Sequence, residues 1–227
     1  MMIKTQPKIL YFSDADSVDF EEKREAIDVI CVGDSITGWN NIRMEKLRTY
    51  SGPFPTYPQF LQEKLSEILG VADYGISGAL SRDELVYVKD ALTRFPNAQY
   101  VVLGFGTNDM GQESDLESTS EEIINNYNKV IQVISERAKP ILINVPYLNE
   151  SMTPREFIAE SKKRRDYHNQ RLKRYCDSKN IYLVDICSVL NDDCFSDAVH
   201  PNEKGARLIA NELYKLLVEK VMRRPVM

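Results

Sequence analysis

Histidine is scarce in this sequence, and its scarcity excludes one kind of site. The 227 residues contain two histidines, His168 and His200, which lie too far apart for the H-E-x-x-H helix of zinc proteases. A histidine-rich metal centre is therefore not expected. The four cysteines form no C-x-x-C pair, which fits a reducing compartment. The sequence also contains no G-x-S-x-G stretch, which argues against the nucleophile elbow of ordinary α/β-hydrolases.

Long apolar runs and an excess of basic residues are missing as well. No run is long enough to span a bilayer, and residues 1–7 lack the apolar core of a signal peptide. We therefore expect a cytoplasmic protein without a membrane span. The formal net charge of -5 provides no basic footprint for nucleic acid, so no nucleic-acid partner is expected. The length suits one sizeable α/β domain, and nothing in the sequence indicates an oligomeric state.

Five short apolar runs are separated by stretches with helical periodicity. Strands that alternate with helices predict a three-layer α/β/α sandwich around a five-stranded parallel sheet. Right-handed crossovers then bring the carboxyl ends of all five strands to one edge of the sheet. The expected strands lie at residues 27–32, 71–74, 100–103, 140–145 and 181–185.

The helical patterns have recognisable ends. The apolar stripe from Leu61 to Leu69 predicts a helix, and Gly70 fits the C-cap glycine of that helix. A highly charged helix is expected over residues 154–178, and a closing helix from about Pro201 to Met222.

Residues 27–227 are expected to form a single domain. The preceding residues 1–26 contain one apolar patch, Ile9 to Phe12, which is followed by acidic residues. This segment is either an N-terminal arm or an extra edge strand of the sheet, and both interpretations stay open.

The first buried strand ends in a chemically suggestive turn. Residues 27–32 form a nearly continuous apolar run that stops at Gly33 and is followed by Asp34 and Ser35. In open α/β sheets ligands bind beyond the carboxyl ends of the strands, where Ser35 is expected to lie. The alternative is a simple Gly-Asp turn in which Ser35 caps the next element. A serine nucleophile would need a neighbouring base, itself oriented by a third group.

His200 is the better candidate for that base. His168 shares a helical stripe with Leu172, which is typical of a packing residue. His200 precedes Pro201, which suits the start of a helix and keeps His200 itself out of helical geometry. The carboxylate of Asp197 can then fold back to the imidazole from three residues away. The alternative is that Asp197 and His200 are ordinary loop residues.

Three groups at neighbouring strand ends could stabilise an oxyanion. They are the N–H of Ser35, the N–H of Gly78, whose α-carbon carries no side chain, and the side-chain amide of Asn108. Asp109 is expected to accept backbone N–H bonds that fix the turn after the third strand.

A long polar and aromatic connection, residues 39–58, leaves the same strand end as Ser35. Connections of this length inside a compact domain are usually functional or mobile. Trp39, Phe54 and Tyr57 are therefore candidates for a pocket wall, and the alternative is a surface loop held by its aromatic residues. We expect Trp39 and Asp34 to contact the substrate.

Four sequence blocks resemble those of the GDSL/SGNH hydrolases, in the same order: Gly33-Asp34-Ser35-Ile36, Gly78, Gly106-Thr107-Asn108-Asp109 and Asp197-Ala198-Val199-His200-Pro201. The resemblance spans about residues 27–222. It implies a flavodoxin-like SGNH fold and metal-free hydrolysis of esters or thioesters without a cofactor. Ile36 stands where the family usually has leucine, and the second block contains both Gly75 and Gly78.

The resemblance also implies roles for individual residues. Ser35 would be the nucleophile, His200 the base and Asp197 its partner. The oxyanion hole would consist of the Ser35 and Gly78 N–H groups and the Asn108 amide.

Together these features predict a serine hydrolase that cleaves carboxylic esters through an acyl-enzyme on Ser35. The expected substrate is a small molecule: a short-chain acyl or acetyl ester, with a thioester or a lysophospholipid as further options. One alternative is a flavodoxin-like module without esterase activity, in which Gly33–Ser35 cradles a phosphate or Asp34 and Asp109 hold a divalent metal. Another is a carbohydrate-binding remnant of the same fold.

Overall fold

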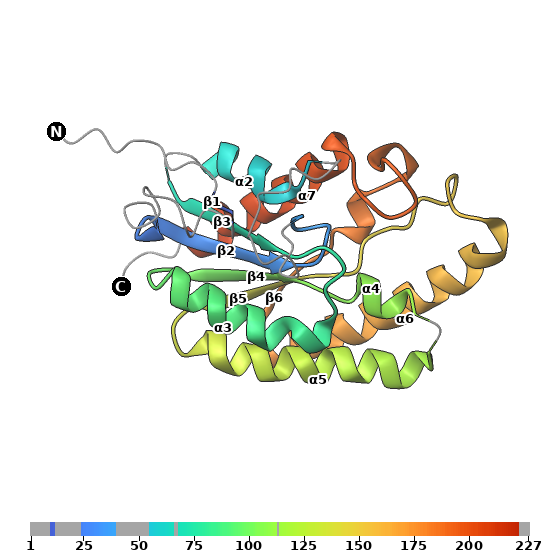
Figure 1. The fold of residues 1–227 in the computed structure, drawn as a ribbon, viewed down its shortest axis with the longest axis horizontal. Helices are drawn as coiled ribbons and strands as arrows, with labels where there is room; N and C mark the ends of the chain where they lie inside the picture. Colours follow the sequence, from blue (N-terminus) through green and yellow to red (C-terminus); the bar gives the residue numbers. More distant parts are fainter. Residues whose placement is uncertain (1–9, 12–23, 40–54, 66–67, 113, 223–227) are drawn as a thin grey trace, which may run out of the picture.

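The structure is a computed structural model that describes residues 10–11, 24–39, 55–65, 68–112 and 114–222. Its centre is a parallel sheet with the strand order β1-β3-β2-β4-β5-β6 (Figure 1). The strands are β1 (Leu10–Tyr11), β2 (Ile27–Gly33), β3 (Gly70–Gly75), β4 (Tyr100–Gly104), β5 (Lys139–Ile143) and β6 (Tyr182–Val184).

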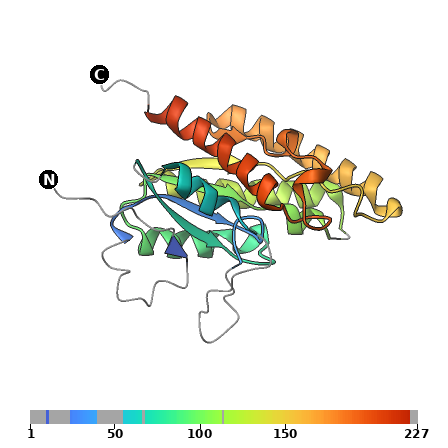
Figure 2. The same cartoon turned by 90° about the horizontal axis from the view of Figure 1, so that it is seen from above.

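Helices cover both faces of the sheet, so the predicted three-layer α/β/α sandwich is confirmed (Figures 1 and 2). One face carries α3 (Glu84–Arg94), α5 (Leu116–Ser135) and α6 (Arg155–Lys179). The other face carries α2 (Tyr57–Leu65) and α7 (Glu203–Lys215), which Figure 2 shows lying across the strands. Shorter elements complete the described fold: η2 (Ser81–Asp83), α4 (Thr107–Met110), η3 (Cys187–Val189), η4 (Asp192–Cys194) and the π-helical η5 (Leu216–Met222).

The two faces of β2 explain its continuous apolar sequence. Successive side chains of a strand point to opposite faces. Ile30 and Val32 accordingly belong to the core under α3, α5 and α6, whereas Val29 and Cys31 belong to the core under α2 and α7. A strand buried on both faces has no polar side, which is why no alternation appears in its sequence.

Strands β2 to β6 form at the five expected apolar runs. A sixth strand, the two-residue β1, lies at the edge of the sheet. Leu10 and Tyr11 pair in parallel with Ala72 and Asp73 of β3. These two residues fall within the apolar patch of the N-terminal segment.

None of the helices in the described part of the chain combines the length and the apolar character that a membrane span requires.

One expected helix end was wrong, and the expected start of another helix near Pro201 is shifted by two residues. Gly70 is the first residue of β3 rather than a helix cap, because it pairs with Ile27 and a Cβ there would lie 2.1 Å from the Ala26 carbonyl oxygen. Helix α7 begins after Pro201, at Glu203. The Asn202 side chain caps it by accepting a hydrogen bond of 3.1 Å from the Gly205 N–H.

Candidate active site

The carboxyl ends of the strands lie along one edge of the sheet, at the right of Figure 1, and the turn that carries Ser35 follows β2 there. The Asp34 N–H donates to the Gly104 carbonyl oxygen at 3.2 Å. The Asp34 carbonyl oxygen in turn accepts the N–H groups of Thr37 and Gly38, both at 3.0 Å. These bonds close a tight turn directly after the strand, and Ser35 lies within it with 8% of its surface exposed.

His200 comes from the other end of the chain and meets Ser35. Its Nε2 atom lies 3.0 Å from the Ser35 Oγ atom, and its Nδ1 atom lies 2.8 Å from Oδ2 of Asp197. With its proton on Nδ1, the imidazole donates to the carboxylate and accepts from the Ser35 hydroxyl. The structure therefore brings Ser35, His200 and Asp197 into one hydrogen-bonded chain, which we call the Ser35–His200–Asp197 chain.

Asp197 is held in place by the loop that it shares with His200. Its Oδ1 atom accepts the N–H of His200 at 2.7 Å and that of Val199 at 2.8 Å. Partial burial tends to raise the pKa of Asp197, but the hydrogen bonds donated by His200 and Val199 outweigh it and lower the pKa below the usual range. Asp197 thus stays an anion beside the imidazole over a wide pH range.

The two other expected oxyanion donors are Gly78, on the loop after β3, and Asn108, on the short helix α4, and these two segments are joined to each other. Gly78 is exposed and has φ +75, a conformation that favours glycine. The Asn108 Nδ2 atom donates to the Ala79 carbonyl oxygen at 2.9 Å. An amide nitrogen carries two protons, so this bond leaves the second one for another acceptor.

Asp109 accepts a backbone N–H as expected, but the donor lies on the loop after β3, so the bond joins that loop to the β4 end and does not fix the turn after β4 by itself. Its carboxylate accepts the Ser81 N–H at 3.1 Å and the Ser81 hydroxyl at 2.7 Å. Ser81 was not among the expected site residues, although a serine shortly after a glycine turn and at the start of a helical pattern is a usable signal for such a bond.

Asp34 lies beneath the Ser35 turn. Its Oδ1 atom accepts the Ile36 N–H at 3.0 Å, and the residue is 1% exposed. Burial raises the pKa of Asp34 to about 7. We expected Asp34 to contact the substrate, but its carboxyl group is buried beneath the turn. It accepts the Ile36 N–H there and holds the turn instead.

The aromatic candidates for a pocket wall differ in placement. The Trp39 ring lies 4.9 Å from the His200 ring between centroids, at an interplanar angle of 42°. Tyr57 is fully buried in the core under α2, with its hydroxyl 3.2 Å from Thr37 Oγ1, so it forms no pocket wall. Phe54 lies outside the described residues.

His168 is remote from this chemistry, as its helical stripe indicated. It is fully buried on α6, and its Nδ1 atom lies 3.0 Å from Ser120 Oγ. Burial lowers its pKa to about 4, so it is neutral near pH 7.

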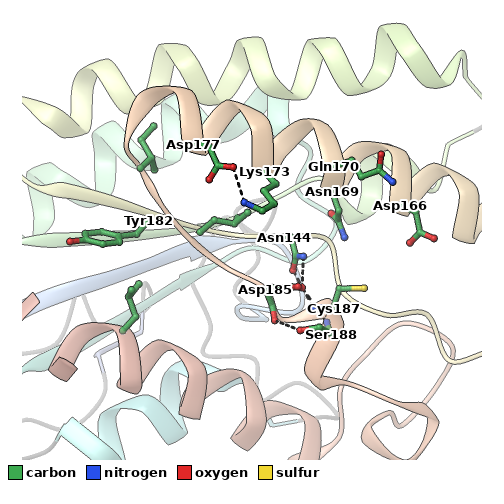
Figure 3. Close-up of a pocket in the computed structure, with 13 residues that line it drawn as sticks. Asn144, Asp166, Asn169, Gln170, Lys173, Asp177, Tyr182, Asp185, Cys187 and Ser188 are labelled. Atoms are coloured by element: carbon green, nitrogen blue, oxygen red, sulfur yellow. Dashed lines mark hydrogen bonds and ion pairs between the residues drawn. The ribbon is translucent and has the colours of Figure 1, made fainter. Parts of the chain in front are cut away.

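A cavity of about 570 Å³ lies between α6 and the edge strand β6 (Figure 3). Its wall includes Asn169 and Lys173 of α6, and Asn144 and Asp185 beyond the ends of β5 and β6. None of its lining residues belongs to the Ser35–His200–Asp197 chain, so this cavity is separate from the candidate active site.

Across the described ranges, no group of three or more His, Cys, Asp and Glu side chains is arranged to hold a metal ion.

Comparisons with known proteins agree with this geometry. The model of the GDSL-like lipase/acylhydrolase family matches residues 31–208. One similar solved structure is a member of the lipolytic G-D-S-L family from Veillonella parvula, with 23% identity and a TM-score of 0.62, covering 87% of this chain and 100% of that chain. No curated protein sequence matches this chain.

Two further similar structures are esterases of acetylated carbohydrates. A variant of an acetyl-xylooligosaccharide esterase from Geobacillus stearothermophilus has 19% identity and a TM-score of 0.64, covering 84% of this chain and 95% of that chain. A carbohydrate acetylesterase from Sinorhizobium meliloti has 18% identity and a TM-score of 0.64, covering 85% and 98%. At these identities the likeness shows the fold. The match over residues 31–208 shows that the chain belongs to the GDSL-like lipase/acylhydrolase family, and it is a GDSL-type carboxylic ester hydrolase.

Proposed function

We propose that the protein hydrolyses short-chain acyl esters, acetyl esters above all, through a covalent acyl-enzyme on Ser35. The observation that carries this proposal is the continuous chain of hydrogen bonds from the Ser35 hydroxyl through His200 to Asp197, at 3.0 and 2.8 Å. A hydroxyl, an imidazole and a carboxylate in this order constitute an activated serine nucleophile.

In the first step the Ser35 oxygen attacks the carbonyl carbon of the ester while its proton passes to His200 Nε2. The carbonyl π electrons move to the oxygen and form a tetrahedral oxyanion. The Asp197 carboxylate, 2.8 Å from Nδ1, stabilises the imidazolium that results. Because two N–H groups already fix this carboxylate, it needs no rearrangement when the charge appears.

The oxyanion would be stabilised by the N–H groups of Ser35 and Gly78 and by the free proton of the Asn108 amide. The Asn108–Ala79 bond and the Asp109–Ser81 bonds tie the β4 end to the loop after β3. The segments that carry Gly78 and Asn108 are therefore held together, which keeps the Gly78 N–H and the Asn108 amide at a fixed separation. Donors fixed before the reaction stabilise a developing charge better than donors that must reorganise.

The intermediate then collapses. The bond from carbon to the alcohol oxygen breaks, and the alcohol leaves with the proton held on His200, so that Ser35 is acylated. His200 next removes a proton from water, whose oxygen attacks the acyl carbon. The second intermediate releases the carboxylic acid, and the proton returns from His200 to the Ser35 oxygen.

Two observations support a small acyl group. Ser35 is 8% exposed, and the Trp39 ring lies against the His200 imidazole, which limits the room around the nucleophile. In addition, two structures of similar fold are esterases of acetylated carbohydrates. We propose Trp39 as the residue that contacts the substrate on this side.

The test compares the wild type with Ser35→Ala on a series of p-nitrophenyl esters and acyl thioesters of increasing chain length. Wild type should prefer acetate, and Ser35→Ala should lose activity while its circular dichroism spectrum stays unchanged. Ser178→Ala, an exposed serine near the end of α6, is the matched control and should keep full activity. A fluorophosphonate probe should label wild type and the control but not Ser35→Ala. Retained activity in Ser35→Ala would remove the acyl-enzyme from the mechanism.

A further inference from the structure

The buried guanidinium of Arg164 lies at the C-terminal end of α4, the short helix that carries Asn108. Its Nε atom donates to the Met110 carbonyl oxygen at 2.8 Å. Its Nη1 atom donates to the Ser114 carbonyl oxygen at 2.8 Å, and its Nη2 atom to the Ser114 hydroxyl at 3.2 Å. Arg164 is 8% exposed, so one buried cation directs three donors at a single segment.

Helix α4 depends on such partners because it is only four residues long. A single helical turn is not stable by itself, and the last carbonyl groups of any helix lack partners within the helix. The N–H of Met110 donates to Gly106 and that of Gly111 to Thr107, which closes the turn. The Met110 carbonyl points out of the turn and is satisfied by Arg164. A cation at a helix C-terminus is also favourable electrostatically.

The N-terminal end of α4 lies near His168, one helical turn beyond Arg164 on α6. Gly106 precedes α4 with φ +110, and a Cβ built on it would lie 3.5 Å from His168 Nε2. His168 follows Arg164 by four residues, so both lie on one face of α6. Figure 1 shows α4 beside the N-terminal half of α6. Helix α6 thus lies close to α4 at the Gly106 end and is hydrogen-bonded to it at the Met110 end.

We propose that Arg164 is a positioning residue for ester hydrolysis: it fixes the helix that presents Asn108 to the oxyanion. This inference rests on the role proposed above for Asn108. Arg164 touches neither substrate nor reacting atoms, and it acts through α4. A displacement of about 1 Å at a reacting group can cost about 100-fold in rate, so a small movement of α4 is enough to matter.

The fork of the guanidinium contributes to this role in addition to its charge. It reaches the Met110 carbonyl and the Ser114 carbonyl and hydroxyl at once, whereas a lysine ammonium is a single compact charge on a flexible stem. Arg164→Lys should therefore keep the charge and lose the geometry. Arg164→Met removes the charge and keeps much of the apolar stem.

The first experiment measures kcat and KM separately for Arg164→Lys and Arg164→Met with p-nitrophenyl acetate. We expect kcat to fall about 10- to 100-fold in Arg164→Met, with a smaller loss in Arg164→Lys, and KM to change less than about threefold. Arg171→Met is the matched control, because Arg171 lies on the same helix and contacts a carbonyl of α5, that of Glu117, at 3.4 Å. Unchanged kcat in both Arg164 variants would overturn the proposal, as would an equal loss in the control.

The second experiment is a double-mutant cycle with Asn108→Ala. If Arg164 acts through Asn108, the double variant Arg164→Met, Asn108→Ala should have nearly the kcat of Asn108→Ala alone. Losses that multiply would mean that Arg164 acts elsewhere, for instance on general stability, and would overturn this inference alone. Retained activity in Ser35→Ala, by contrast, would contradict the proposed acyl-enzyme itself. The two failures are therefore distinguishable.

Discussion

The N–H of Asn149 donates a hydrogen bond of 3.0 Å to the carbonyl oxygen of Ala198. This bond joins the connection between β5 and α6 to the loop that carries Asp197 and His200. Asn149 is 1% exposed, and its Nδ2 atom donates to the Asp192 carbonyl oxygen at 3.2 Å. The imidazole is thus supported by a segment that is distant in the sequence and contributes no group to the proton-transfer chain.

Asn149→Ala should impair both stability and turnover. The substitution leaves the Asp192 carbonyl and the Ser151 N–H without their partner, and a lost buried hydrogen bond costs about 1 to 3 kcal/mol. We expect a lower urea midpoint and a kcat reduced by about tenfold, because the side-chain bond to Asp192, just before the loop with His200, is lost while the backbone bond to Ala198 remains. Asn125→Ala, an exposed asparagine on α5, should change neither quantity. Wild-type kcat in a destabilised Asn149→Ala would show that the support is purely structural.

Asp197→Asn should reduce kcat by about 10⁴-fold with little change in the fold. An amide placed opposite Nδ1 donates where the carboxylate accepts, so the proton moves to Nε2 and the imidazole no longer accepts from Ser35. Asp193→Asn is the control, because Asp193 is an exposed neighbour whose carboxylate pairs with Lys204 at 3.8 Å. The measurement is kcat across a pH series, and activity near wild type in Asp197→Asn would contradict the proposed role of the carboxylate.

Asn108→Ala should lower kcat by about 100- to 1000-fold, the usual effect of removing one oxyanion donor. KM should change much less, because the ground-state carbonyl carries little charge. The substitution also removes the bond to the Ala79 carbonyl, so the thermal midpoint should be measured beside the kinetics. A KM effect without a kcat effect would assign Asn108 to substrate binding instead.

Alanine substitutions at Gly78 and Gly106 should differ in their effect on stability. Both glycines have positive φ, where a side chain costs roughly 1 to 2 kcal/mol. A Cβ on Gly78 meets nothing within 4 Å, whereas a Cβ on Gly106 lies 3.1 Å from Cγ2 of Val145. Urea unfolding should therefore show a larger loss for Gly106→Ala. Equal losses would mean that the Val145 side chain moves aside without cost.

The carboxyl group of Asp73 should make the protein less stable as the pH rises from about 4 to about 8. Burial raises its pKa to about 8. The unfolded chain loses this proton near pH 4 and the folded chain only near pH 8, so this contribution to stability is complete at low pH and is lost as the pH rises between these values. Asp73→Asn can still accept from the Gly75 N–H, and its amide can donate to Thr56. Its thermal midpoint should therefore fall less than that of wild type from pH 5 to pH 8.

The parts of the fold that follow from local pattern were predictable from the sequence. Apolar runs with β-branched residues mark β2 and the strands beside it, because strands buried on both faces must be apolar throughout. The pairing of Asp197 with His200 was also predictable, since both residues share a short loop before Pro201. Strand order then brings Ser35 and Asn108 to the same edge of the sheet.

Contacts between distant segments left no such local pattern. Tyr57 resembles a pocket residue in a polar connection, yet helix α2 turns it into the core. Gly70 resembles a helix cap, yet the close approach of the Ala26 carbonyl is what requires a glycine there. The supports from Asn149 and Arg164 join segments separated by more than forty residues, so neither spacing nor periodicity could indicate them.

With two histidines in its sequence, this enzyme is a convenient subject for magnetic resonance. Isotopically labelled histidine would produce signals from two imidazoles. That of His168, fully buried with a pKa of about 4, should remain constant near neutral pH and serve as an internal reference. The other belongs to His200, so the proton on the reacting imidazole can be followed directly during inhibitor binding without competing resonances.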